Sequence, residues 1–156
     1  MTRNSLVLIA AGGSAALLAA AFAFQYLGGL APCALCLWQR WPHAAAVAIG
    51  ALCLVLPGAL PPLLGAAAAA STGGIGVYHA GVEYGWWAGP SSCSGGGDVS
   101  SLSVEDLAAQ IMSAPVVRCD EVVWQVLGLS MAGWNALIAA GLTGLWLLAA
   151  RRAYLG

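Results

Sequence analysis

The chain contains no lysine, and charged residues of every kind are scarce. Of its 156 residues only 7% are charged, namely five arginines and six acidic residues, against about 25% in an ordinary soluble domain. So few charges cannot cover a folded chain of this size with a hydrated surface. The composition therefore excludes a soluble globular protein, and it equally excludes a disordered tail and a nucleic-acid binder.

The few charges are separated by long apolar runs. There are 36 uncharged residues between Arg3 and Arg40, 42 between Arg40 and Glu83, and 29 between Glu121 and Arg151. Each run is longer than the roughly 20 apolar residues that cross the hydrocarbon core of a bilayer as a helix. The sequence predicts an integral membrane protein.

Four membrane spans are expected, at about 6–27, 36–56, 60–82 and 127–150, within a single domain covering residues 1–156. The prolines and glycine between positions 57 and 62 leave only a short connection, so the second and third spans should form an antiparallel hairpin. This pattern indicates an all-α fold, a four-transmembrane-helix antiparallel bundle. Gly12, Ala16 and Ala20 lie four residues apart in the first span, a spacing that lets helix backbones approach closely in lipid.

The arginines near the chain ends indicate the orientation. Arg3 precedes the first span, and Arg151 and Arg152 follow the last, so both termini are expected in the cytoplasm. The loops at about 28–35 and 83–126 would then lie outside the cytoplasm. The longer loop holds all six acidic residues and one arginine, a net charge of −5.

A short helix is expected within this longer loop. Ser103 and Asp106 have the spacing of a capping box, and Leu102 is placed to contact Leu107. The residues on its apolar face would be Val104, Leu107, Ala108 and Ile111, with Pro115 ending the segment. The sequence leaves two interpretations open, an amphipathic helix lying on the membrane surface and a helix packed on the bundle.

Topology sorts the five cysteines. Cys33 and Cys36 lie at the outer mouth of the second span, and Cys93 and Cys119 lie in the longer outer loop. Four cysteines outside the cytoplasm, as two pairs, suggest two disulfides. Cys53 lies within the second span and is interpreted as a small buried apolar residue.

The pair formed by Cys33 and Cys36 has the features of a redox centre. Two cysteines separated by two residues at a helix start close a small ring when they form a disulfide. In the reduced form, the helix N-terminus stabilises a thiolate there. Arg40 follows Cys36 by one helical turn and should stabilise its thiolate further. An arginine within an apolar span costs about 2.5–3.5 kcal/mol on insertion scales, which marks Arg40 as a functional candidate. A zinc site would require all four outer thiolates to converge on one metal and is not favoured.

The placement of the two pairs suggests a relay. A pair on a water-exposed loop can meet a protein partner, and a pair at the membrane surface can meet a lipid-soluble oxidant. Disulfide exchange between the pairs would carry two electrons without metal or flavin.

Three segments resemble the bacterial disulfide-bond formation protein B (DsbB) family. The sequence Pro-Cys-Ala-Leu-Cys-Leu-Trp-Gln-Arg at 32–40 is similar to that family's Pro-Cys-x-Leu-Cys-x-x-(Glu/Gln)-Arg signature, with Gln39 where Glu often stands. Residues 119–131 are similar to the family's second-loop cysteine and the entry to its last span, and residues 78–83 to the end of its third span.

The resemblance implies an inner-membrane thiol:quinone oxidoreductase that reoxidises a periplasmic thioredoxin-fold thiol oxidase of the DsbA type. It implies that Cys93 accepts the attack of this partner and releases Cys119, which then attacks Cys33. Cys36 would face a bound ubiquinone or menaquinone, and Arg40 would hold its charge. Besides the DsbA-like partner it implies contact with the quinone pool and membrane lipid, and neither a metal nor a nucleic acid is expected.

The two histidines leave alternatives open. His79, near the outer end of the third span, is a candidate to line the quinone pocket, with a plain packed histidine as the alternative, and His43 is interpreted as structural. A pair of histidines on antiparallel spans would also suit a four-span haem-binding electron carrier, although haem does not explain two cysteine pairs. A non-catalytic membrane scaffold with a disulfide-stapled loop would leave Cys33, Cys36 and Arg40 without a role. An epoxide-reducing relative with the same helix bundle and Cys-x-x-Cys pair is a further alternative. Only substrate data would distinguish it from a thiol oxidase.

Overall fold

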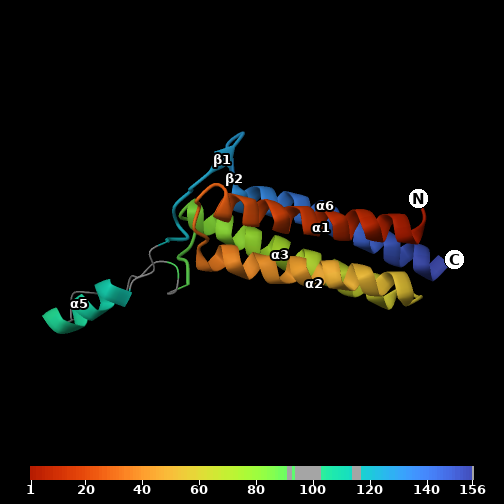
Figure 1. Cartoon of the computed structure of the whole chain (residues 1–156), viewed down its shortest axis with the longest axis horizontal. Coiled ribbons are helices and arrows are strands. Elements are labelled where there is room, and N and C mark those ends of the chain that lie inside the picture. The colour runs from red at the N-terminus through yellow and green to blue at the C-terminus, as the bar shows by residue number, and fades with distance from the viewer. Residues whose placement is uncertain (91–92, 94–102, 114–116, 156) are drawn as a thin grey trace.

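Four long helices run side by side in the computed structural model, which describes the chain except residues 91–92, 94–102, 114–116 and 156 (Figure 1). These helices are α1 (Arg3–Tyr26), α2 (Ala34–Val55), α3 (Leu60–Glu83) and α6 (Met131–Leu155). Consecutive long helices run in opposite directions, and both termini lie at the same end. α2 packs against α1 and α3, and α6 packs against the same two helices.

Three of these helices, α1, α3 and α6, are long and apolar enough to cross a membrane. α2 falls outside that group because Gln39, Arg40 and His43 interrupt its first half. Large apolar side chains point outward from the three helices, among them Leu8, Leu64 and Leu148, each about half exposed. Such surfaces suit contact with lipid tails. The three apolar helices confirm the prediction of a multi-pass membrane protein.

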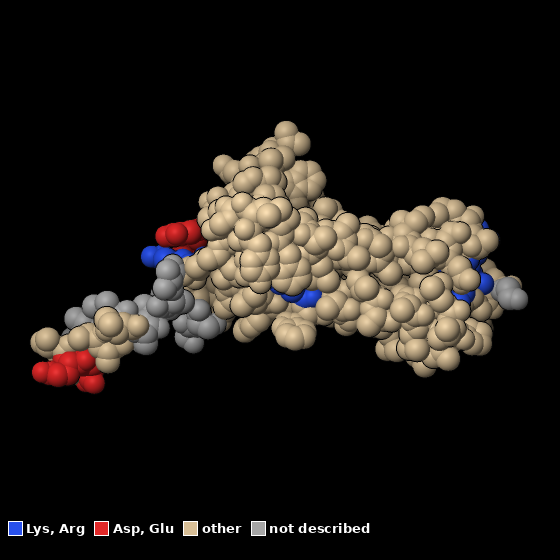
Figure 2. Space-filling view, viewed as in Figure 1, with Lys and Arg blue, Asp and Glu red and all other residues tan. Residues whose placement is uncertain are grey.

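Charged side chains gather toward the two ends of the molecule (Figure 2). Red acidic groups appear at the end where α3 meets the outer loop, with a blue basic group beside them, and also on α5, and further blue basic groups appear at the end that carries both termini. A long uncharged surface separates the two ends, apart from one basic patch along it. This distribution agrees with the uncharged runs of the sequence.

The helix ends have specific local causes. The Thr2 side chain accepts a hydrogen bond from the backbone of Ser5 and caps α1, and Pro61 and Pro62 occupy the first turn of α3, where no donor is lost. Arg3 donates to the carbonyls of Cys53 and Leu56, both at 2.8 Å, and so binds the C-terminal end of α2. A cation is favourable there because the last helical carbonyls have no partner of their own.

Close helix packing depends on glycines that lie opposite larger residues. A Cβ atom on Gly50 would stand 2.4 Å from Cβ of Ala11, and one on Gly65 would stand 2.6 Å from the ring of Trp146. Trp146 is fully buried at the centre of the larger apolar core. A Cβ atom on Gly12, which the sequence spacing singled out, would have no neighbour within 4 Å among the described residues. Small residues permit close approach at Gly50 and Gly65, whereas Gly12 makes no such contact with the described residues.

The outer loop contains a helix, α5 (Val104–Ser113), that lies apart from the four long helices in Figure 1. Its start agrees with the predicted capping box, because Ser103 Oγ donates to the Asp106 carboxylate and accepts from the Asp106 backbone. Leu102 and Pro115, together with the side chains of Leu107 and Ile111, lie outside the described residues. Its amphipathic character and its contact with a membrane stay predictions.

A short hairpin leads into the last helix. Strands β1 (Gln125–Val126) and β2 (Leu129–Ser130) pair antiparallel, and the two residues between them, Leu127 and Gly128, both have positive φ. Such a two-residue turn matches the twist of a hairpin. The indole of Trp134 donates to the carbonyl of Val126 and ties the hairpin to α6.

Candidate active site

The sulfur atoms of Cys33 and Cys36 lie together at the start of α2. Cys33 is the N-cap residue, with extended backbone, and its Sγ accepts a hydrogen bond of 3.2 Å from the backbone N–H of Cys36. The two Sγ atoms are 2.7 Å apart, so a small shift would bring them to the roughly 2.05 Å of a disulfide. The hydrogen bond with Cys36, together with burial, raises the pKa of the Cys33 thiol. The pair can therefore cycle between dithiol and disulfide without moving the helix.

Cys93 and Cys119 form a disulfide that connects residues 26 positions apart. Both cysteines are buried, at 1% and 0% exposure, and they belong to one apolar cluster with Cys33. The expectation of a water-exposed cysteine pair is wrong, because Cys93 and Cys119 pack against Cys33 and Val82 at the mouth of the bundle. Beside Cys119, the Arg118 guanidinium donates two hydrogen bonds to Asp120 and lowers the pKa of that carboxyl.

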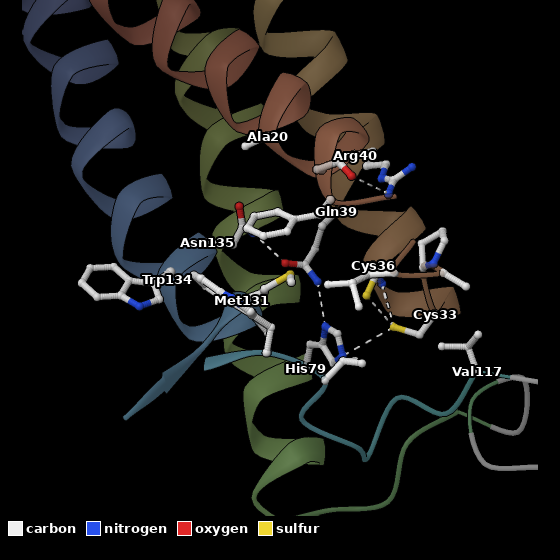
Figure 3. Close-up of a pocket in the computed structure, with 18 of the residues that line it drawn as sticks. Ala20, Cys33, Cys36, Gln39, Arg40, His79, Val117, Met131, Trp134 and Asn135 are labelled. Atoms are coloured by element: carbon white, nitrogen blue, oxygen red, sulfur yellow. Dashed lines mark hydrogen bonds between the residues drawn. The ribbon is translucent and has the colours of Figure 1, made fainter. Parts of the chain in front are cut away.

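His79 on α3 faces the cysteine pair. Its Nε2 atom lies 3.6 Å from Sγ of Cys33 (Figure 3). The same atom lies 3.9 Å from the carboxylate of Glu83. One side-chain atom from each of Cys33, Cys36 and His79, of a type that can bind a metal, lies within 4.8 Å of the other two. These three residues are the one such cluster in the part of the chain that the structure describes. The sequence placed His79 near the quinone pocket, but it did not place its ring against the Cys33 sulfur.

Arg40 is held by α1. Its guanidinium donates to Oε1 of Gln25 at 2.6 Å and to the carbonyl of Ala21 at 3.4 Å, and it lies 4.8 Å from the ring centre of Phe22. A polar partner and a cation–π contact both reduce the cost of a guanidinium in an apolar setting. Arg40 is therefore fixed in position rather than free to extend to water.

A cavity of about 210 Å³ lies beside these groups and is bounded by α1, α2, α3, α6 and the outer loop. Most of its wall is apolar, from residues such as Leu17, Phe24 and Met131. Cys36, Arg40 and His79 reach the same cavity. An apolar chamber with a few convergent polar groups is the usual form of a small-molecule site.

Three polar side chains that the sequence analysis gave no role complete the site. Gln39 donates to Nδ1 of His79 at 2.9 Å, and Asn135 donates to Oε1 of Gln39 at 2.7 Å. Ser130 donates to the carboxylate of Glu83 and accepts from the backbone at the start of α6. The available signal was the presence of isolated amides inside apolar spans, where polar groups are costly unless they are paired.

The comparisons with known proteins agree with this geometry. A family model described as "Disulfide bond formation protein DsbB" matches residues 3–149. A disulfide bond formation protein B of Dechloromonas aromatica (strain RCB) is 33% identical over 136 residues, covering 83% of this chain and 81% of that protein.

A second relative, from Stutzerimonas stutzeri (strain A1501), bears the same name and is 31% identical over 160 aligned positions, which cover 95% of this chain and 96% of that protein. No solved structure gives a significant match. The chain therefore belongs to the DsbB family of disulfide bond formation proteins, and its chemistry is disulfide oxidoreduction.

Proposed function

We propose that this protein is an inner-membrane thiol:quinone oxidoreductase that reoxidises a periplasmic thioredoxin-fold thiol oxidase of the DsbA type. Electrons would enter at the loop disulfide formed by Cys93 and Cys119. They would pass to Cys33 and Cys36 and leave to ubiquinone or menaquinone in the cavity. The reaction would sustain disulfide formation in proteins outside the cytoplasm.

One observation carries the proposal. The loop disulfide and Cys33 pack in the same buried cluster, and Cys33 and Cys36 also line the cavity. Two redox pairs in contact can exchange disulfides through local rotations, since a thiolate needs only to reach the sulfur that it attacks. Cys33 and Cys36 therefore join the loop pair to the cavity.

The proposed relay balances as a series of exchanges. The partner thiolate attacks Cys93, forming a mixed disulfide and releasing Cys119 as a thiolate. Cys119 attacks Cys33, which breaks the bond to Cys36 and leaves Cys36 as a thiolate. The partner's second thiolate then attacks the mixed disulfide and releases Cys93, which attacks Cys119 and releases Cys33. Each step forms one disulfide and breaks one, and only after these last two steps have two electrons moved from the partner to the pair on α2.

The cavity suits a quinone as the terminal acceptor. Its apolar wall matches the ring and the side chain of a lipid-soluble quinone. The positive charge of the Arg40 guanidinium would stabilise the negative charge that develops on a quinone carbonyl oxygen during reduction. A quinone bound in the cavity would accept the two electrons. The role of Cys36 is to present its sulfur to the cavity, and that of His79 is to offer its ring at the edge near Cys33.

The proposed topology has four membrane crossings: α1, α3 and α6, which are apolar enough by themselves, and in addition α2. Its polar residues face helix neighbours, since Gln39 and His43 are buried and Arg40 bonds to α1. A span with such residues is tolerated when they pair inside the bundle. The end with Arg3, Arg151 and Arg152 would face the cytoplasm, and the end with the cysteine pairs would face the periplasm.

The test combines purified protein, a reduced thioredoxin-fold partner and a short-chain quinone, with quinone absorbance followed over time. We expect quinone reduction in proportion to partner oxidation. Cys36→Ser should abolish it while the loop disulfide still forms. Cys53→Ala is the matched control, because Cys53 is buried in the other core cluster and should leave turnover intact. Turnover that persists in Cys36→Ser would refute the relay, and a wild-type protein that reduces no quinone would favour the scaffold alternative.

A further inference from the structure

A chain of hydrogen bonds leads from Cys33 across three helices. His79 on α3 lies against the Cys33 sulfur, Gln39 on α2 donates to His79, and Asn135 on α6 donates to Gln39. At the far end, Nε2 of His43 lies 2.8 Å from Oδ1 of Asn135. Figure 3 shows Gln39 between His79 and Asn135. The order of donors along this chain decides which atoms carry protons.

Two backbone carbonyls fix the orientation of both amides. Nε2 of Gln39 also donates to the carbonyl of Leu35 at 3.1 Å, and a carbonyl can only accept. Nδ2 of Asn135 lies 3.3 Å from the carbonyl of Thr72, to which it donates in the same way. Turning either amide by 180° would direct an oxygen at a carbonyl oxygen. The nitrogen of each amide is therefore assigned by its partners.

The fixed amides determine the state of His79. Because Gln39 presents an N–H to Nδ1 of His79, Nδ1 has to be the bare, accepting nitrogen of a neutral ring. The single ring proton then lies on Nε2. Among the described residues, the Cys33 sulfur and the Glu83 carboxylate lie near Nε2, and both can accept a hydrogen bond from it. The surroundings of the two ring nitrogens thus favour the same tautomer independently.

We propose that Gln39 and Asn135 are positioning residues that keep the proton of His79 on Nε2, so that His79 donates a hydrogen bond to Cys33 when that sulfur leaves as a thiolate. The proposal rests on the relay put forward above, in which Cys33 becomes joined to Cys119. It adds a role for three residues that lies outside quinone binding.

The step that gains from this donor follows from the exchange sequence. After the partner has left in its disulfide form, Cys93 is a thiolate and Cys33 is bonded to Cys119. Cys93 attacks Cys119, the bond between Cys93 and Cys119 forms, the bond between Cys119 and Cys33 breaks, and the electron pair goes to Cys33. A better stabilised leaving thiolate leaves faster. Cys33 is 4% exposed, so water cannot supply that stabilisation and His79 is placed to do so.

The direct test is the tautomer of His79, which nitrogen NMR of histidine-labelled protein reports without any turnover. The chain has two histidines, so His43→Gln assigns the signals of the other. Long-range coupling to the ring carbons' protons distinguishes Nδ1 from Nε2. In the wild-type protein with Cys33 and Cys36 reduced, we expect a neutral His79 with a protonated Nε2 and a bare Nδ1. A proton on Nδ1 would overturn the inference outright.

Two variants reverse the direction of the hydrogen bonds. Gln39→Glu places a carboxylate at Nδ1, which can only accept, so Nδ1 should become protonated. Asn135→Asp removes the donor to Gln39, so the Gln39 amide should turn and Nδ1 of His79 should gain a proton although Asn135 does not touch the ring. Thr143→Val is the control on the same helix, because its hydroxyl donates to the carbonyl of Ala139 and takes no part in the chain. If neither reversal alters His79, the positioning role is refuted.

A kinetic measurement links the tautomer to the chemistry. Disulfide mapping after rapid acid quench follows the loss of the Cys33–Cys119 disulfide. Its rate should fall about tenfold in Gln39→Glu and in Asn135→Asp, as expected for loss of a hydrogen bond to a charged group, and should be unchanged in Thr143→Val. An unchanged rate together with a switched tautomer would overturn the catalytic part. Failure of the relay itself would show differently, as wild-type protein with the expected tautomer but no Cys33–Cys119 disulfide.

Discussion

Replacing Gly65 by alanine should destabilise the protein through a single contact. The added Cβ would stand 2.6 Å from two atoms of the Trp146 ring, well inside the ordinary contact distance for carbon atoms. Trp146 is fully buried, so its ring or the helix that carries it would have to shift by roughly 1 Å. Overpacking of this kind costs about 1–3 kcal/mol, and alanine returns about 1 kcal/mol of helix propensity. We expect a net loss of up to about 2 kcal/mol.

Gly74→Ala on the same helix is the matched control. A Cβ at Gly74 has no described neighbour within 4 Å, so only the gain in helix propensity should remain. The assay is thermal unfolding in detergent, followed by tryptophan fluorescence at one fixed scan rate. The midpoint should fall by several degrees in Gly65→Ala and should hold or rise in Gly74→Ala.

A compensating change makes the reasoning sharper. Trp146→Phe leaves space beside α3, so adding it to Gly65→Ala should recover part of the lost midpoint, although Trp146→Phe alone should lower it. If Gly65→Ala proved as stable as Gly74→Ala, the close approach of α3 and α6 at this point would be refuted. The folded fraction of Gly65→Ala should keep its redox activity, because the substituted contact belongs to the core cluster that excludes the four outer cysteines.

Further substitutions and reagents address other contacts. Arg3→Ala removes two hydrogen bonds to carbonyls at the end of α2 and should lower the free energy of unfolding by about 1–2 kcal/mol in the same thermal assay; an unchanged midpoint would contradict this. Ser130→Ala removes the donor to Glu83 and the cap of α6, at a cost of about 1 kcal/mol, and a loss well below that would mean that the cap contributes little. In reduced protein, iodoacetamide should modify the half-buried Cys36 before Cys33, and Cys33 should react only at a higher pH than an ordinary thiol, because its raised pKa keeps it protonated. Mass spectrometry across a pH series checks both, and the opposite order would refute the arrangement.

The sequence predicted those features that depend on local spacing. Cys33 and Cys36, three positions apart at a helix start, were expected to meet, and their sulfurs do lie together. The lack of charge predicted membrane spans, and the capping box at Ser103 was found at the start of α5. In each case the physical cause lies within one continuous stretch of the chain, so the sequence contains all of it.

Features that depend on contacts between distant segments were not predicted. Gln39 meets His79 across 40 positions and Asn135 across 96, and no spacing rule relates residues on separate helices. The same holds for Gly65, whose neighbour Trp146 comes from the last helix. Burial of the loop disulfide was missed for a related reason, since a loop rich in acidic residues and glycine is expected in water until its packing is known.

The sealed position of the sulfur atoms has a consequence for selectivity. Cys33, Cys93 and Cys119 are each at most 4% exposed, so small thiols dissolved in the surrounding fluid have no direct path to them. An incoming protein would have to displace the loop before its own thiolate could attack. Under the proposed relay, the loop disulfide would then be reduced by a docked partner rather than by small thiols such as glutathione, and Cys36, which is half-buried, would be the redox sulfur most open to such thiols.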